Sequence, residues 1–112
     1  MGQRKPKPPD VEVLDSKARR DDGRILVDGR VRNSGEKPLR GLVVFFDLLT
    51  PEKGVVASEN AVLDEQSVRP GEERAYHSVT SDYARAVRYR IRATDNAARE
   101  LRVANAGPFP IE

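Results

Sequence analysis

Between residues 24 and 33, apolar and polar side chains alternate along the chain. The apolar set is Ile25, Val27, Gly29 and Val31, and Arg24, Asp28, Arg30 and Arg32 stand between them. Only Leu26 departs from the alternation. A period of two suits a half-buried β-strand and does not suit a helix. A turn-rich stretch over residues 33–38 follows, and a second apolar run begins at Leu42, so we expect an all-β domain.

The same alternation returns near the end of the chain, where Val87, Tyr89, Ile91 and Ala93 are separated by Arg88, Arg90 and Arg92. Other apolar segments bounded by turn residues predict further strands over Val11–Lys17, Leu42–Leu49, Val55–Leu63, Glu73–Thr80 and Arg99–Ala104. A hairpin loop is expected over residues 19–23, with the turn dipeptide Asp22-Gly23, and residues 107–111 read as an irregular end. No segment shows an apolar period of 3.6 over three turns.

About seven strands with a turn every ten residues or so predict a β-sandwich. Its core candidates are Val13, Ile25, Val27, Val31, Leu42, Val44, Phe46, Leu48, Tyr76, Val87, Tyr89, Ile91 and Leu101. The strand Leu42–Leu49 is apolar on both faces, with Val43 and Phe45 opposite the core set. We therefore expect it to be a central strand whose outer side is covered by loops, long side chains or a partner.

The chain has 112 residues, which predicts one domain. Residues 1–10 begin with a basic, proline-rich segment and are expected to form a flexible linker, and residues 11–112 are expected to form the folded domain. There is no cysteine, so disulfides and zinc–thiolate sites are excluded. No apolar run approaches the roughly 20 residues that span a bilayer. The formal net charge of +2 gives no general field for nucleic acid, which we do not expect as a partner.

The sequence contains no motif for chemistry, and we expect no enzyme, no cofactor and no catalytic or metal-ligating residue. His77 is the only histidine and has no evident triad partners in the sequence. Asp21, Asp22, Asp82 and Asp95 fall in predicted loops without the spacing of a calcium loop, which leaves calcium binding there open.

One surface feature suggests binding. Arg88, Arg90 and Arg92 project to one face at about 7 Å intervals and form a row of guanidinium groups. If Arg30 and Arg32 lie on a neighbouring strand, the row widens into a patch. The alternative interpretation is a solvated face, neutralised by acidic residues of adjacent strands such as Asp28 or Glu100.

A series of residues also resembles the bacterial FxLYD-type domain. It comprises Val27-x-Gly29-x-Val31-x-Asn33, Pro38-Leu39, Phe46-x-Leu48-Leu49, Gly54-Val55-Val56 and Pro70-Gly71-Glu72 with Tyr76. The resemblance covers about residues 11–103 and implies an immunoglobulin-like antiparallel β-sandwich at the bacterial cell envelope. Leu49 and Thr50 replace the tyrosine and aspartate of the motif, so no role of that pair is carried over. The desiccation-associated LEA14-like sandwich is a near alternative.

The motif residues have structural explanations. Gly29 is expected to make room for a bulky neighbour such as Phe46 or Tyr89, and Asn33 to accept hydrogen bonds from turn amides. Pro70-Gly71 suits the middle of a type II turn.

Together these features predict a non-enzymatic accessory or interaction module. The leading expectation is contact with a protein, through an exposed edge strand or the Val43–Phe45 side of the third strand. The alternatives are binding of an anionic glycan or lipid headgroup through the arginine row, and a stress-related, LEA14-like stabiliser. An extracytoplasmic location is expected, periplasmic or tethered to the membrane by an upstream anchor outside this chain, with the cytoplasm left open.

Overall fold

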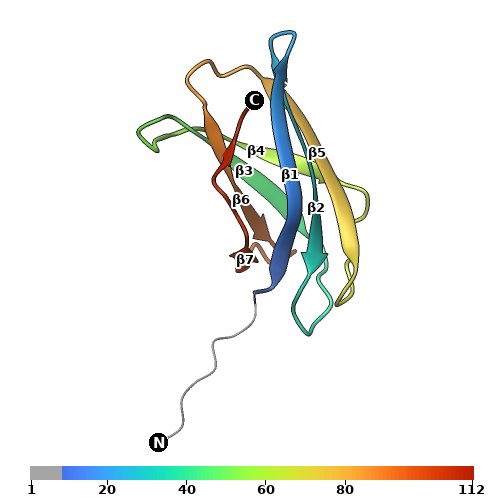
Figure 1. The fold of residues 1–112 in the computed structure, drawn as a ribbon. Coiled ribbons are helices and arrows are strands. Elements are labelled where there is room, and N and C mark those ends of the chain that lie inside the picture. The colour runs from blue at the N-terminus through green and yellow to red at the C-terminus, as the bar shows by residue number, and fades with distance from the viewer. Residues whose placement is uncertain (1–8) are drawn as a thin grey trace, which may run out of the picture.

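The computed structural model describes residues 9–112, and in this part of the chain every regular element is a β-strand (Figure 1). The strands are β1 (Val11–Asp21), β2 (Arg24–Asn33), β3 (Val43–Leu49), β4 (Val55–Leu63), β5 (Glu73–Ser81), β6 (Arg88–Thr94), β7 (Val103–Ala104) and β8 (Phe109–Pro110). The all-β prediction is confirmed.

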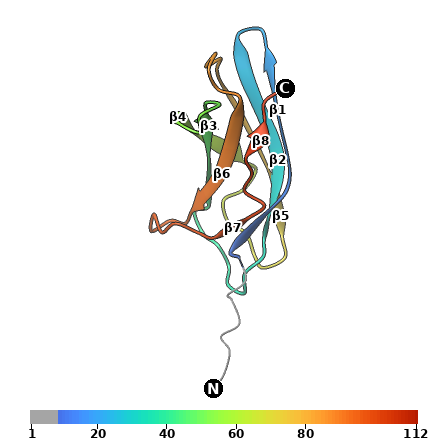
Figure 2. The same cartoon turned by 60° about the vertical axis from the view of Figure 1, so that its left-hand side comes forward.

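The eight strands form one mixed sheet in the order β7-β1-β2-β5-β4-β3-β6-β8. β4 joins its two halves, because most of β4 pairs with β3 while its last residues, Val62 and Leu63, pair with β5. The sheet curls into a half-barrel at this strand, and Figure 2 shows β3 and β6 opposite β1, β2 and β5. The structure thus shows a single curled sheet of eight strands, and the expected sandwich of about seven strands is not confirmed.

The segment after residue 100 lies between the two edges of the curled sheet. Its β7 runs parallel to β1, and its β8 pairs antiparallel with β6. Between them the Ile91 amide donates to the Ala106 carbonyl at 2.9 Å, and farther on the Arg20 amide donates to the Glu112 carbonyl at 2.9 Å. The expected strand Arg99–Ala104 was too long, and the expected irregular end contains β8. Strands of two residues are formed by pairing with segments distant in the sequence. They are too short to show an alternation of apolar and polar residues from which they could be predicted.

The first hairpin is tighter than expected. β1 continues to Asp21, which pairs with Arg24, so only two residues make the turn. These are Asp22 (φ 52°) and Gly23 (φ 74°), the paired positive φ values of a type I′ turn. The expected loop over residues 19–23 was too long, because residues 19–21 belong to β1. These three residues are polar because this end of the hairpin is exposed, so they lack the alternation by which a half-buried strand is recognised.

The core lies on the inner face of the curled sheet. Of the predicted core residues all are buried except Val87, which is half-buried. Further core members outside the list of candidates are Val11, Val68, Ala86 and Ala93, of which Ala93 belongs to the alternating apolar set near the end of the chain. The alternation in β2 and β6 therefore identified the inward side correctly.

A small polar chain crosses this core. The Tyr76 hydroxyl donates to Ser16 Oγ at 2.5 Å, and the Ser16 and Tyr89 hydroxyl oxygens lie 2.6 Å apart. Burial raises the pKa of both tyrosines, so both phenols stay protonated. A Cβ on Gly29 would overlap the Asp15 carbonyl and the Tyr76 hydroxyl. Gly29 does make room for an aromatic residue, but that residue is Tyr76 and not Phe46 or Tyr89.

Three loops meet at the end of the molecule where β1 begins. Asn33 Oδ1 accepts from the Gly35 amide at 3.0 Å, as expected, and Gly71 has the positive φ of +85° that the predicted turn requires. The expected linker, residues 1–10, lies outside the described residues except for Pro9 and Asp10. Both residues are hydrogen-bonded to the folded domain: the Ser34 hydroxyl donates to the Pro9 carbonyl, and the Asp10 carboxylate accepts from the Arg102 amide.

Candidate binding surface

The outer face of β3 and β6 carries the predicted arginine row. Antiparallel pairing places Phe45 opposite Arg92, Asp47 opposite Arg90 and Leu49 opposite Arg88. On the other side of β3, the partners of the same three residues are Asn60, Ser58 and Val55 of β4. We call this face, made of Phe45, Asp47, Leu49, Arg88, Arg90 and Arg92, the basic face.

Asp47 organises the centre of the basic face. Its carboxylate accepts from Arg92 Nε at 2.9 Å, Arg92 Nη2 at 3.1 Å, Arg90 Nη2 at 3.0 Å and Ser58 Oγ at 2.7 Å. The Asp47 side chain is only 4% exposed, while those of Arg90 and Arg92 are 47% and 39% exposed. Burial raises the pKa of Asp47, but the hydrogen bonds from Ser58 and the two arginines outweigh it and leave the pKa below its ordinary value. Asp47 is therefore ionised at neutral pH.

Phe45 and Val43, expected on the outer side of β3, are both half-buried there. The Arg92 guanidinium carbon lies 5.5 Å from the centre of the Phe45 ring, within the range of a cation–π contact. The long side chains of Arg90 and Arg92 thus cover the outer side of β3, one of the three coverings expected from the sequence.

Arg88 completes the row and is exposed, with no ion pair to any residue in the range 9–112. Asp47 is the one carboxylate of residues 9–112 that forms an ion pair with these three guanidinium groups, so two of their three positive charges are left without a paired carboxylate. The acidic residue paired with the row is Asp47. Asp28 lies on β2 in the other half of the sheet, and Glu100 pairs with Thr94, two residues beyond Arg92, without an ion pair to the row.

Arg30 and Arg32 do not extend this row. They lie on β2, which three strands separate from β6 in the sheet order. Arg30 is paired with Asp15 at 2.8 Å and with Glu73 at 3.2 Å, and Arg32 is paired with Glu12. These acidic partners neutralise Arg30 and Arg32. In the described sheet, the two arginines therefore do not widen the row of Arg88, Arg90 and Arg92 into a patch.

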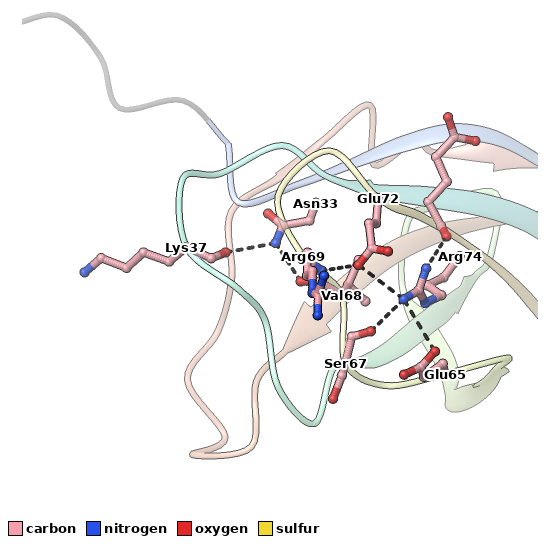
Figure 3. Close-up of polar contacts among 9 residues, drawn as sticks. Asn33, Lys37, Glu65, Ser67, Val68, Arg69, Glu72 and Arg74 are labelled. Atoms are coloured by element: carbon pink, nitrogen blue, oxygen red, sulfur yellow. Dashed lines mark hydrogen bonds and ion pairs between the residues drawn. The ribbon is translucent and has the colours of Figure 1, made fainter.

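A second polar cluster occupies the loop end of the molecule (Figure 3). Arg74 donates to the carbonyls of Glu73 and Ser67, each at 2.8 Å, and lies 3.6 Å from Glu65 and 3.5 Å from Glu72. Its Nε is the one buried side-chain polar atom of residues 9–112 without a partner. The cluster borders an open hollow of about 620 Å³. The charges of Arg74, Glu65 and Glu72 are paired with one another, so we interpret this cluster as stabilising the loop before β5.

Among residues 9–112, those considered for other chemistry form no metal-type cluster, although Asp82 lies beside the turn that contains Asp22, where its amide donates to the Gly23 carbonyl at 3.2 Å. His77 is exposed on β5, opposite Val62 and Asp28. Asp82 is paired with Arg20 at 2.8 Å, and Asp95 accepts hydrogen bonds from Arg99 at the other end of the strands. Within residues 9–112, no three histidine or acidic side chains gather as a metal site would require.

The part of the chain that the structure describes has no helix long and apolar enough to cross a membrane. No family model matches the chain, and no curated protein matches it. Among solved structures, it is similar to part of the crystal structure of a selenomethionine-labelled beta-glucosidase from Kluyveromyces marxianus, with 15% identity and a TM-score of 0.39. This similarity covers 91% of the present chain but only 14% of the beta-glucosidase chain. At this degree of overlap it supports no statement about fold family or activity.

Proposed function

We propose that this chain is a non-enzymatic interaction module that docks an acidic protein segment on its basic face. The observation that carries the proposal is a row of three arginines paired with one carboxylate, in which Asp47 and Phe45 hold Arg90 and Arg92 in place and Arg88 stays exposed. A surplus of fixed charge attracts a partner of opposite sign and fixes its register.

The composition of the face favours a protein partner over a glycan or a lipid headgroup. Arginine and aromatic side chains are enriched at protein interfaces, where their large flat groups bury much area at small entropic cost. Here Arg92 and Phe45 are in contact, and the exposed Val55 lies beside Leu49 at the other end of the row. Residues 101–112 bond to β1 and β6, so an open edge for the other route expected from the sequence is left where β4 and β5 diverge, away from their pairing at Val62 and Leu63.

Kinship with FxLYD-type domains, with their immunoglobulin-like sandwich, is part of the proposal. Its support is the motif series in the sequence and two sheet halves that face each other across one core. The same resemblance is the support for a bacterial, extracytoplasmic location. Genomic DNA upstream of Met1 tests the location: an anchor or signal segment supports it, and a native start at Met1 favours a stress-related, LEA14-like role.

The binding proposal is tested with fluorescein-labelled poly-L-glutamate, measured by fluorescence anisotropy against the wild-type chain and Arg88→Glu. We expect Arg88→Glu to weaken binding about tenfold, because it removes an attraction and adds a repulsion at an exposed site. The matched control is Arg24→Glu, the same charge reversal at an exposed residue of β2 in the other sheet half. The control is expected to change binding less than twofold at physiological salt, where screening acts over about 8 Å.

Anionic phospholipid vesicles and heparin are measured in parallel as probes of the alternative. Equal losses in Arg88→Glu and Arg24→Glu, or no binding of poly-L-glutamate, would overturn docking on the basic face. Binding of vesicles or heparin that requires Arg88, without binding of poly-L-glutamate, would establish the glycan or headgroup function instead.

A further inference from the structure

The geometry of the basic face points to the kind of segment that it takes: we propose an extended stretch of chain with acidic residues at alternate positions, lying along β6. This inference rests on the proposed function and adds the spacing and conformation of the partner.

The spacing of the row follows from the strand. Arg88, Arg90 and Arg92 are alternate residues of β6, while Tyr89 and Ile91 between them are buried on the inner side. Alternate residues of a strand repeat at about 6.8 Å on one face. A partner segment in the extended conformation has the same repeat, so acidic side chains at every second position meet the three arginines one to one. In a helical partner, acidic residues on one face recur every three or four positions instead.

Two of the three arginines, Arg90 and Arg92, are preorganised, so the partner must conform to their positions. Arg92 is held by two hydrogen bonds to Asp47 and by the Phe45 ring, and Arg90 by one bond to the same carboxylate. These bonds use Nε and Nη2 of Arg92 and Nη2 of Arg90, which leaves Nη1 of each guanidinium for a second carboxylate. Fixing the side chains before binding lowers the entropic cost of the complex. Asp47 is thus a positioning residue for the arginines.

The segment lies on the face of the sheet and does not extend it. β6 is paired along one side with β3, and along the other with β8 and, through Ile91, with the Ala106 carbonyl. Its backbone groups are therefore not open to a further strand, and recognition is made by side chains. Sequence specificity then resides in the positions of the acidic residues.

The test uses two labelled peptides of identical composition, Thr-Glu-Thr-Glu-Thr-Glu-Thr-Thr and Thr-Glu-Thr-Thr-Glu-Thr-Thr-Glu. In an extended chain the first presents three carboxylates on one face, and the second puts successive carboxylates on opposite faces. The second therefore loses two of three ion pairs, and we expect the alternating peptide to bind about fivefold more tightly. Affinities are measured at low ionic strength by titration of backbone and arginine side-chain NMR resonances.

In Arg88→Gln the preference for the alternating peptide is expected to shrink to about twofold, because only two arginines remain to be matched. In Arg24→Gln, the control, it stays at about fivefold. Equal affinities, with both peptides still dependent on Arg88, would refute the extended spacing and leave docking on the basic face intact. Tighter binding of the second peptide would favour a helical partner and also refute it. Binding of both peptides that is indifferent to Arg88 would overturn this inference and the proposed function together.

Discussion

Replacing Asp47 by asparagine tests how the basic face is held together. The substitution keeps the shape of the side chain and one carbonyl oxygen, which still accepts from Ser58 and from one arginine N–H. The new amide nitrogen stands where Oδ2 accepts from Arg92 Nε and Arg90 Nη2, so donors would face donors. Two charge-assisted hydrogen bonds are lost, and a buried amide is left without an acceptor.

The loss of stability in Asp47→Asn depends on how deeply Asp47, Arg90 and Arg92 are buried. Breaking a fully buried ion pair costs about 3–5 kcal/mol. Arg90 and Arg92 are about half exposed and recover water when released, so each lost arginine contact counts as a surface pair of about 0.5 kcal/mol. The buried amide that faces donors adds about 1 kcal/mol. We expect Asp47→Asn to lower the free energy of unfolding by about 2 kcal/mol, or the melting temperature by about 10 °C for a domain of this size.

The pH dependence gives the second part of this test. The pKa of Asp47 lies below its ordinary value of 3.8, so in acid the unfolded state binds more protons than the folded state. The stability from this carboxylate is therefore complete above pH 3.8 and is lost as the pH falls through the folded pKa. The difference between wild type and Asp47→Asn should be constant near neutral pH and should narrow in acid. Other carboxylates titrate in both proteins and cancel in the difference.

Urea unfolding of both proteins at pH 7 and pH 3 supplies these values. Asp28→Asn is the matched control, since Asp28 is exposed on β2 and the substitution should change stability by less than about 0.5 kcal/mol. A loss of less than about 0.5 kcal/mol in Asp47→Asn at pH 7, or a difference that does not narrow in acid, would refute the reasoning.

Three further substitutions probe the rest of the molecule. Gly29→Ala would push a methyl group into the Asp15 carbonyl and the Tyr76 hydroxyl, and we expect a loss of about 3 kcal/mol in urea unfolding that Tyr76→Phe does not rescue, because the carbonyl remains. Asn33→Ala removes three buried or half-buried hydrogen bonds between loops and should cost about 2 kcal/mol in the same assay; a loss under 0.5 kcal/mol would contradict this role. Arg20→Ala frees the loop before β6, which Arg20 holds through two carbonyls and a carboxylate, and should speed amide hydrogen exchange there without affecting β2.

The sequence predicted the long strands well and the closure of the sheet poorly. β2 and β6 alternate in polarity because one face of each is buried, and this period survives in the sequence. β7 and β8 are two residues long and exist only because β1 and β6 offer free edges beside them. The role of β4 was equally hidden, since nothing in Val55–Leu63 indicates that its last residues change partner. Pairing between distant segments is decided by the tertiary structure.

For the candidate surface, the row of arginines was visible in the sequence but the group that orders it was not. Asp47 is a polar position within the expected strand Leu42–Leu49, and nothing in the sequence links it to the arginines. A single carboxylate inside Phe-Phe-Asp-Leu-Leu is itself a signal, since an aspartate in a central strand needs cationic partners. The strand register decides which cations are these partners. It places Arg90 directly opposite Asp47, and Arg92 opposite Phe45, two residues before Asp47 on β3. Register also separates Arg30 and Arg32 from the row, and alternation alone carries no information about it.

The placement of residues 101–112 between β1 and β6 has a consequence for how the chain acquires its structure during synthesis. Asn105 and Val13, joined by a hydrogen bond of 2.9 Å, are 92 positions apart, so β1 leaves the ribosome long before its outer neighbour exists. Until then the edges of β1 and β6 expose unpaired amides and carbonyls, the groups through which nascent chains associate. Such distant pairing makes folding slow relative to helical domains of this size. Between the emergence of β1 and the closure of the sheet, exposed strand edges therefore favour association with other chains most strongly.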